Sequence, residues 1–212
     1  MAERKMQRDM RPAPRARGPP PDFDFSFIRK ILKQGLIMSA SSALEKTVPV
    51  YSSSFRQCSL LAVTLGLQMG WSVHERNGEI KFGSAAFRSS AYEGEGMKFL
   101  RLRYWLEETS KKSGGFDAVI FADIQIHSST QSAVVYGGFL GQLTAWCDWR
   151  QIPYIGVLMA DVRKYVIGSD LTDQQRLIDA LRRKGFVSAS KETAGALAVL
   201  DWALHYKAQE KL

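Results

Sequence analysis

The sequence is poor in cysteine, histidine and long apolar runs. Its two cysteines, Cys58 and Cys147, are too few for a disulfide scaffold, and we expect both to be reduced, small apolar residues. The three histidines, at positions 74, 127 and 205, have no partners at metal-ligand spacing, which argues against a zinc site. No run approaches the roughly 18 apolar residues of a membrane span, and no apolar stretch follows the basic N-terminus as in a secretory signal. These absences favour an intracellular, cytoplasmic protein.

Positive charge is present in excess and is unevenly distributed. The 212 residues include 29 Lys and Arg against 21 Asp and Glu, a formal net charge of +8, and the pI is near 9.6. This balance favours a polyanionic partner, with nucleic acid first and an anionic membrane surface second. Half of the excess lies in residues 1–21, where two acidic residues oppose six basic ones: Arg4, Lys5, Arg8, Arg11, Arg15 and Arg17.

The same first 21 residues hold five of the seven prolines and have almost nothing apolar to bury. We therefore expect a disordered basic arm, which either contacts phosphates or serves only as a solubilising tail. Residues 22–58 begin with an amphipathic stretch and continue as a serine-rich linker. The apolar residues of this stretch recur at helical spacing: Phe25, Ile28, Leu32 and Leu36. Such a stripe packs against protein more often than on a membrane, so residues 22–38 are a candidate protein-binding segment.

Residues 59–212 read as one folded domain that begins with three strands and then alternates helices and strands. Hydrophobic residues make up 45% of the chain, which suits a globular protein. The patterns predict strands over 59–64, 71–75, 80–87, 117–124 and 153–158, with a hairpin turn at Asn77-Gly78. They predict helices over 95–112, 132–150, 172–184 and 191–207. This order is that of an α/β, ribonuclease-H-like fold, in which helices flank a mixed five-stranded sheet.

Several short motifs follow one another along this domain, and their order and spacing matter more than any single one of them. They are Leu61–Gly66 with Gly70-Trp71, Tyr92–Met97 with Phe99–Arg101, Val135–Gly138 with Leu143–Cys147, Ile152–Tyr154 with Gly156-Val157, and Ala194 and Ala196–Ala198 with Asp201–Leu204. Together they resemble the RuvC family of Holliday-junction resolvases, especially its phage and prophage branch, over about residues 59–207. The resemblance implies a ribonuclease-H-like fold and a homodimer that forms through a helical face.

The resemblance also implies metal-dependent cleavage, for which four acidic side chains hold two divalent ions about 3.5–4 Å apart. The family takes one acid from the first strand, one from the fourth strand and two from the last helix. In this sequence the four positions are occupied by Thr64, Ala122, Glu192 and Gly195. Asp123 adjoins Ala122, but neighbouring residues of a strand point to opposite faces, so only a bulge would re-aim its carboxylate.

Basic residues of the family are missing as well. The Gly168–Gln174 run lacks both lysines of the family's Gly-Lys-Gly-Asn-Ala-Asp-Lys pattern, and Gln125–Thr130 lacks the basic residues common there. The departures coincide with the catalytic face, whereas the core-packing stretches persist. This distribution predicts a kept fold with a lost cleavage activity and no cofactor.

Our preferred interpretation is a pseudonuclease that binds branched or duplex DNA, or a nucleoprotein partner, by shape or charge. The arm, together with Arg101 and Arg103 of the helix predicted over 95–112, would contact phosphates. One alternative is an active Mg²⁺-dependent junction endonuclease with a rearranged site, built from Asp123, Glu192 and either Glu93 or Asp161. Another is a protein-binding scaffold or inhibitor that acts through residues 22–38.

Three other groups of residues are explained more simply by structural roles than by catalysis or DNA binding. His127 with Ser128 and Ser129 lacks an orienting acid and an oxyanion loop, so it reads as a loop rather than a nucleophile. The Arg182–Lys184 run suits a helix C-terminus as well as it suits DNA. The tryptophans of the predicted helices are expected in the core or at a dimer interface: Trp105, Trp146, Trp149 and Trp202.

Overall fold

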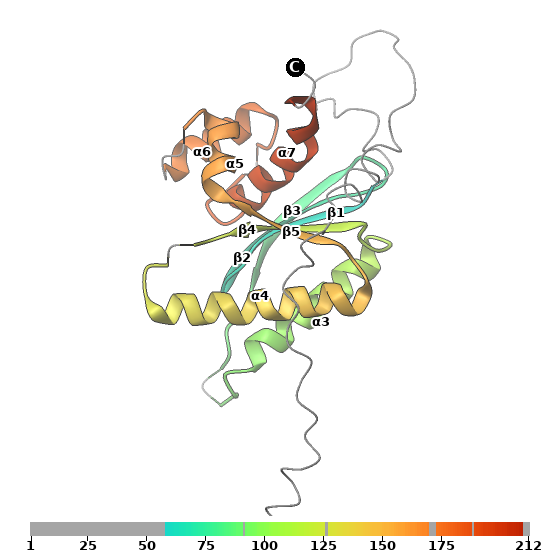
Figure 1. The fold of residues 1–212 in the computed structure, drawn as a ribbon, viewed down its shortest axis with the longest axis vertical. Helices are drawn as coiled ribbons and strands as arrows, with labels where there is room; N and C mark the ends of the chain where they lie inside the picture. Colours follow the sequence, from blue (N-terminus) through green and yellow to red (C-terminus); the bar gives the residue numbers. More distant parts are fainter. Residues whose placement is uncertain (1–57, 91, 126, 170–172, 188, 210–212) are drawn as a thin grey trace, which may run out of the picture.

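The computed structural model describes residues 58–90, 92–125, 127–169, 173–187 and 189–209. The predicted arm and the amphipathic segment over 22–38 lie outside this part of the chain. The described part forms a five-stranded mixed sheet with helices on both faces (Figure 1). This architecture confirms the fold class predicted from the sequence.

The sheet has the spatial order β3-β2-β1-β4-β5. Its strands are β1 (Leu60–Thr64), β2 (Gln68–His74), β3 (Ile80–Ala86), β4 (Ala118–Asp123) and β5 (Tyr154–Leu158). The first three pair antiparallel, whereas β4 runs parallel to both β1 and β5. The C-terminal ends of β1, β4 and β5 therefore meet at one edge of the sheet.

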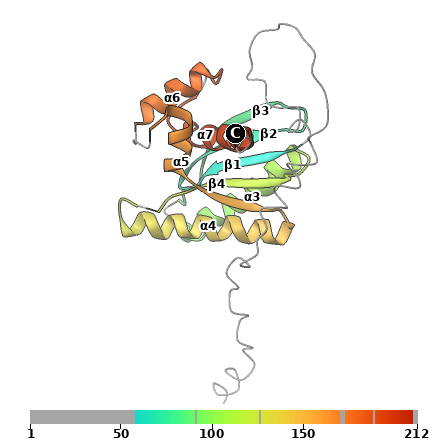
Figure 2. The ribbon, with the colours of Figure 1, turned by 45° about the horizontal axis from the view of Figure 1, so that its top comes forward.

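The helices divide between the two faces of the sheet, as Figures 1 and 2 show from two directions. One face is covered by α3 (Met97–Lys112) and α4 (Thr130–Arg150), and the other by α5 (Met159–Ile167), α6 (Gln174–Arg183) and α7 (Ala194–Gln209). Because side chains alternate along a strand, β1 sends Leu61 and Val63 to the α3–α4 side, and Leu60 and Ala62 to the α7 side. Each side has its own hydrophobic core.

The structure corrects two details of the sequence interpretation. Helix α5 was not expected, because it starts directly after β5 without a turn residue, and Leu158 precedes it without a side-chain cap. The strand predicted over 71–75 starts earlier, at Gln68, so Gly70 lies inside β2. In the part of the chain that the structure describes, no helix is long and apolar enough to cross a bilayer.

Candidate functional site

The four positions predicted from the sequence to correspond to the family's acids lie together where β1 and β4 end. Thr64 ends β1, Glu192 precedes α7, and Gly195 lies in the first turn of α7. A methyl group at position 195 would lie only 2.7 Å from Thr64 Cγ2, so these two positions face each other. The parallel register pairs Val63 with Phe121, which places the next residues, Thr64 and Ala122, side by side on the face under α7.

This cluster of positions holds a single carboxylate. The Thr64 hydroxyl accepts a hydrogen bond from the Gly70 N–H at 3.1 Å and lies 3.4 Å from the Gly70 carbonyl oxygen. Ala122 is fully buried, and Gly195 has no side chain to offer. The Glu192 carboxylate is exposed and accepts a hydrogen bond from the Ser190 hydroxyl at 2.9 Å. Its own backbone N–H and the Ser190 hydroxyl lower the pKa of Glu192, so this acid is ionised at neutral pH.

Helix α7 closes tightly over this edge of the sheet. A methyl group at position 70 would lie 2.0 Å from the Glu192 carbonyl oxygen, so only glycine permits this approach of the two backbones. The Ser72 hydroxyl donates to the Ala196 carbonyl oxygen at 2.9 Å and fixes the first turn of α7 on β2. The close packing explains why residue 70, inside strand β2, is glycine.

Asp123 lies on the opposite face of the sheet from Thr64. The Tyr136 hydroxyl of α4 lies 3.5 Å from Asp123 Oδ1, donates to the Ala122 carbonyl at 3.1 Å and accepts from the Ile124 N–H at 3.3 Å. The β4–β5 register runs without interruption through Asp123, so no bulge re-aims this carboxylate. Asp123 therefore packs beside α4, away from Glu192.

The other acids of the rearranged site are also dispersed. Glu93 lies in the loop before α3, where it pairs with Arg101, and Asp161 lies in the first turn of α5. Among the residues that the structure describes, no group of three or more His, Cys, Asp or Glu side chains could hold a metal ion. Because Mg²⁺ requires several converging oxygen ligands, the residues at this edge do not fit it.

The two arginines predicted to contact phosphates have partners within the protein. Arg101 forms two hydrogen bonds with the Glu93 carboxylate, at 2.7 and 2.8 Å, and also donates to the Arg88 carbonyl oxygen. The guanidinium of Arg103 lies over the ring of Trp149, 5.3 Å from its centroid. Arg101 thus holds a loop in place, while Arg103 remains exposed beside an aromatic ring. The six basic residues of the arm lie outside the described part of the chain.

The residues around His127 have structural roles. Ser129 caps α4, accepting a hydrogen bond from the Ser132 N–H at 3.1 Å, and the His127 ring lies 4.9 Å from that of Tyr136. At the end of α6, Arg182 donates to the Ala189 carbonyl, and Lys184 pairs with Asp201. The Arg182–Lys184 run therefore helps to close α6 onto α7.

A buried charge network under α5 and α6 was not found from the sequence. Asp201 of α7 is 1% exposed and pairs with Lys184 and with His205, whose Nδ1 lies 3.3 Å from Asp201 Oδ1. Burial alone would raise the pKa of Asp201, but hydrogen bonds from His205 and Lys184 outweigh it and lower the pKa. The hydrogen bond to Asp201 raises the pKa of His205. The i,i+4 spacing of Asp201 and His205 was visible in the sequence, whereas Lys184 reaches Asp201 only through the fold.

Solved structures with the same arrangement of strands and helices are Holliday-junction resolvases. RuvC of T. thermophilus in complex with a Holliday-junction substrate matches with a TM-score of 0.58 and 15% identity, over 70% of this chain and 93% of that chain. A second Thermus thermophilus RuvC structure matches with a TM-score of 0.57 and 18% identity, over 71% and 96% of the two chains. The fold is that of RuvC.

A third RuvC-like match extends further along this chain. The yeast mitochondrial Holliday junction resolvase has a TM-score of 0.51 and 15% identity, and the match covers 88% of this chain and 94% of that one. No protein-family model and no curated protein sequence matches the chain. The RuvC-like resemblance therefore rests on the motifs in the sequence and on the ribonuclease-H-like fold.

Proposed function

We propose that this protein is a RuvC-like pseudonuclease, which binds branched or duplex DNA without cleaving it. The observation behind this proposal is the edge where β1 and β4 end. Thr64, Ala122 and Gly195 lie there, at positions where the sequence resemblance expects three acids, and Thr64 and Gly195 are packed against each other. The partner class is supported by the net charge of +8 and by the fold shared with a RuvC that is bound to a Holliday-junction substrate.

Binding in this proposal depends on shape and charge. The basic residues of the arm contact phosphates without reading sequence, and such contacts weaken steeply as salt rises. No cofactor takes part. The protein acts inside the cell, in a bacterial, phage or plasmid context. A protein partner for residues 22–38 stays a prediction, because that segment lies outside the described residues.

The protein further acts as a homodimer, formed through the outer face of α4. The first 18 residues of this helix contain no charged side chain, whereas the outer face of a surface helix normally carries charged and polar residues. Its exposed face has valine and tryptophan at the ends and small residues between them: Val134, Gly137, Gly141, Ala145 and Trp149. Val134 is 68% exposed and Trp149 is 62% exposed. An apolar stripe of this kind suits a two-fold contact between identical helices.

The test combines binding and cleavage in one experiment. The full chain is incubated with labelled four-way junction, duplex and single-stranded DNA, at low and high salt, with Mg²⁺ or Mn²⁺. We expect a salt-sensitive mobility shift and uncut DNA with either metal. Metal-dependent cutting that disappears in Glu192→Gln would overturn the pseudonuclease proposal. Absence of any shift at low salt would overturn nucleic-acid binding.

A further inference from the structure

The loop between β3 and α3 is held in place by hydrogen bonds around Glu93 and carries an exposed aromatic ring, Tyr92. Glu93 is at the centre of these hydrogen bonds. Its N–H donates to the Ser90 carbonyl at 3.2 Å, and its carboxylate accepts from the Ser90 N–H at 2.8 Å. Arg101 of α3 then holds the Glu93 carboxylate with two hydrogen bonds and also binds the Arg88 carbonyl. The Ser90 N–H and the Arg101 guanidinium lower the pKa of Glu93, so the pair stays charged at neutral pH.

Tyr92 lies at the tip of this loop and is fully exposed, with a relative accessibility of 101%. The next most exposed tyrosine among the described side chains is Tyr104 at 66%, and Tyr136 is buried. Apart from Ala91 and Tyr92, residues 88–96 are polar or glycine. Arg88 is exposed before the ring, and Gly94 and Gly96 are exposed after it. Among the described side chains of residues 88–96, Tyr92 is the one large apolar group.

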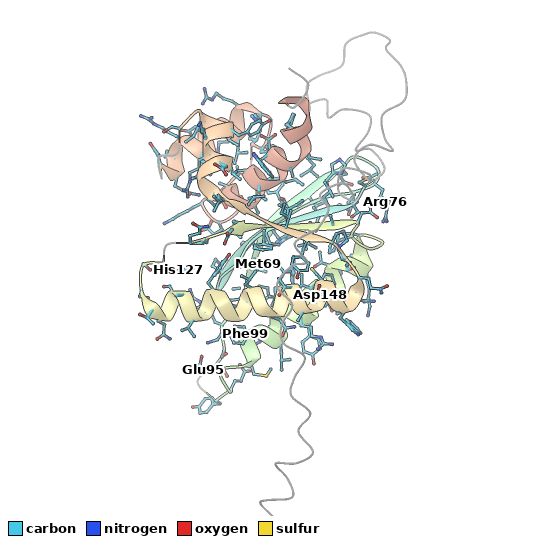
Figure 3. The ribbon with its side chains drawn as sticks, viewed as in Figure 1. Met69, Arg76, Glu95, Phe99, His127 and Asp148 are labelled. Carbon is cyan, nitrogen blue, oxygen red and sulfur yellow. The ribbon has the colours of Figure 1, made fainter. Side chains whose placement is uncertain are left out.

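The loop starts beside the end of β1, where Thr64 lies. The Phe87 N–H donates to the Leu67 carbonyl at 2.9 Å, which ties the end of β3 to the turn that follows Thr64. At the start of α3, Phe99 packs on α4, with its ring centroid 5.2 Å from that of Phe139. Figure 3 shows Glu95 of this loop and His127, which precedes α4, toward the same side of the molecule. The loop therefore starts near the end of β1 and extends on the α3–α4 side of the sheet (Figure 1).

We propose that Tyr92 is a stacking platform for an unpaired nucleobase and that Arg88 contacts the adjoining phosphate. This inference rests on the nucleic-acid binding proposed above. One exposed ring on a loop that is held by hydrogen bonds suits stacking, which needs only an aromatic face and accepts every nucleobase. A protein-binding patch would instead bury several neighbouring large apolar side chains, and the described side chains of residues 88–96 include only Tyr92. Glu93 and Arg101 are positioning residues in this account, because they hold the loop and do not touch the base.

The experiment compares binding of single-stranded and duplex DNA by four forms of the full chain. The single strand carries 2-aminopurine, whose emission falls when it stacks on an aromatic ring. We expect Tyr92→Ala to weaken single-strand binding about tenfold, to leave duplex binding nearly unchanged and to abolish the fall in emission. Tyr92→Phe should retain most of the affinity, because it keeps the ring. Tyr104→Ala is the matched control, since it removes another exposed tyrosine and should leave single-strand binding unchanged.

The salt dependence of binding separates the proposed phosphate contact of Arg88 from the positioning role of Arg101. Arg88→Ala should reduce by about one the number of counterions released on binding. Arg101→Lys loses the bidentate hydrogen bond to Glu93. It should therefore weaken single-strand binding without changing how steeply the affinity falls with salt.

Three results would overturn the inference while leaving nucleic-acid binding intact. One is equal single-strand affinity in the wild type and Tyr92→Ala. Another is a loss in Tyr92→Phe as large as that in Tyr92→Ala, because the hydroxyl and not the ring would then be used. Retained DNA binding with a lost dimer in Tyr92→Ala would assign the tip to a protein contact instead. A wild type that binds no nucleic acid at low salt would overturn this inference and the proposed function together.

Discussion

At the scale of single residues, Asp201 joins three helices through buried charge. Its carboxylate has no exposed surface, and its partners Lys184 and His205 come from the end of α6 and from α7. Tyr165 of α5 completes the group, because Lys184 Nζ lies 4.8 Å from the centroid of its ring. Removing one member of such a group leaves a charge without its partner, which is usually costly. The network therefore fixes how α5, α6 and α7 pack.

This network predicts a loss of stability at alkaline pH. The pKa of His205 is raised in the folded protein, so its contribution is complete below the unfolded value of about 6.5 and is lost as the pH rises through the folded value. The pKa of Asp201 is lowered, so its contribution is lost only at acidic pH. Because the His205 side chain is 32% exposed, solvent screening limits the alkaline loss to about 1 kcal/mol or less.

Urea unfolding between pH 5 and pH 9 measures this effect. The free energy of unfolding of the wild type should fall between pH 6 and pH 9, and His205→Gln should remove that part of the slope. A curve for His205→Gln that parallels the wild type would show that the Asp201–His205 pair does not titrate in this range.

At the scale of elements, the contact between α7 and β1 explains why residue 195 is glycine. A side chain at this position would meet Thr64 Cγ2 at 2.7 Å. Gly195→Ala should therefore lower the free energy of unfolding by about 1–3 kcal/mol through overpacking. In Thr64→Ser, the hydroxyl that binds Gly70 remains and the obstructing methyl is gone. In that background Gly195→Ala should stabilise α7 by up to about 1 kcal/mol, because alanine favours a helix over glycine.

A double-mutant cycle in urea tests this contact between Thr64 and Gly195. Additive effects of the two substitutions would show that α7 does not press on β1 at this point. Gly66→Ala is the control, because a methyl group there finds its nearest neighbour at 3.8 Å and should change stability little.

The elements also show what the sequence could and could not predict. A short apolar run predicted the first strand, and period-two patterns with the Asn77-Gly78 turn predicted the second and third, because these signals act locally. The motif spacing predicted which positions correspond to the family's acids, and this assignment stays a prediction. The structure shows that two of these positions, Thr64 and Gly195, are in contact. Helix α5 was missed because the apolar run of β5 continues into it without a capping residue. The structural role of Arg101 was missed because its partner Glu93 lies in a loop, outside any helical or strand period.

At the scale of the whole molecule, α4 differs from α6, on the opposite face of the sheet, in what it exposes. On one face, α6 alternates buried apolar residues with exposed basic and acidic ones. On the other, the outer side of α4 exposes Val134, glycines and Trp149, and it has no charged residue before Asp148. An uncharged stripe on a 21-residue helix is the part of this surface that gains most from being covered. The proposed two-fold contact would cover it with the same stripe of a second copy.

A charge placed on this stripe should therefore separate the dimer. Across a two-fold axis, Val134→Glu would bring two carboxylates into an apolar contact, so we expect the dissociation constant to rise at least about a hundredfold, near 3 kcal/mol. The matched control is Val187→Glu, because Val187 is equally open at 76% exposure but lies in the loop between α6 and α7, on the other face of the sheet. Light scattering of the full chain over a range of concentrations should find a dimer for the wild type and Val187→Glu and a monomer for Val134→Glu. A monomeric wild type at tens of micromolar, or dissociation by Val187→Glu alone, would place α4 outside the contact and leave its uncharged face to another partner.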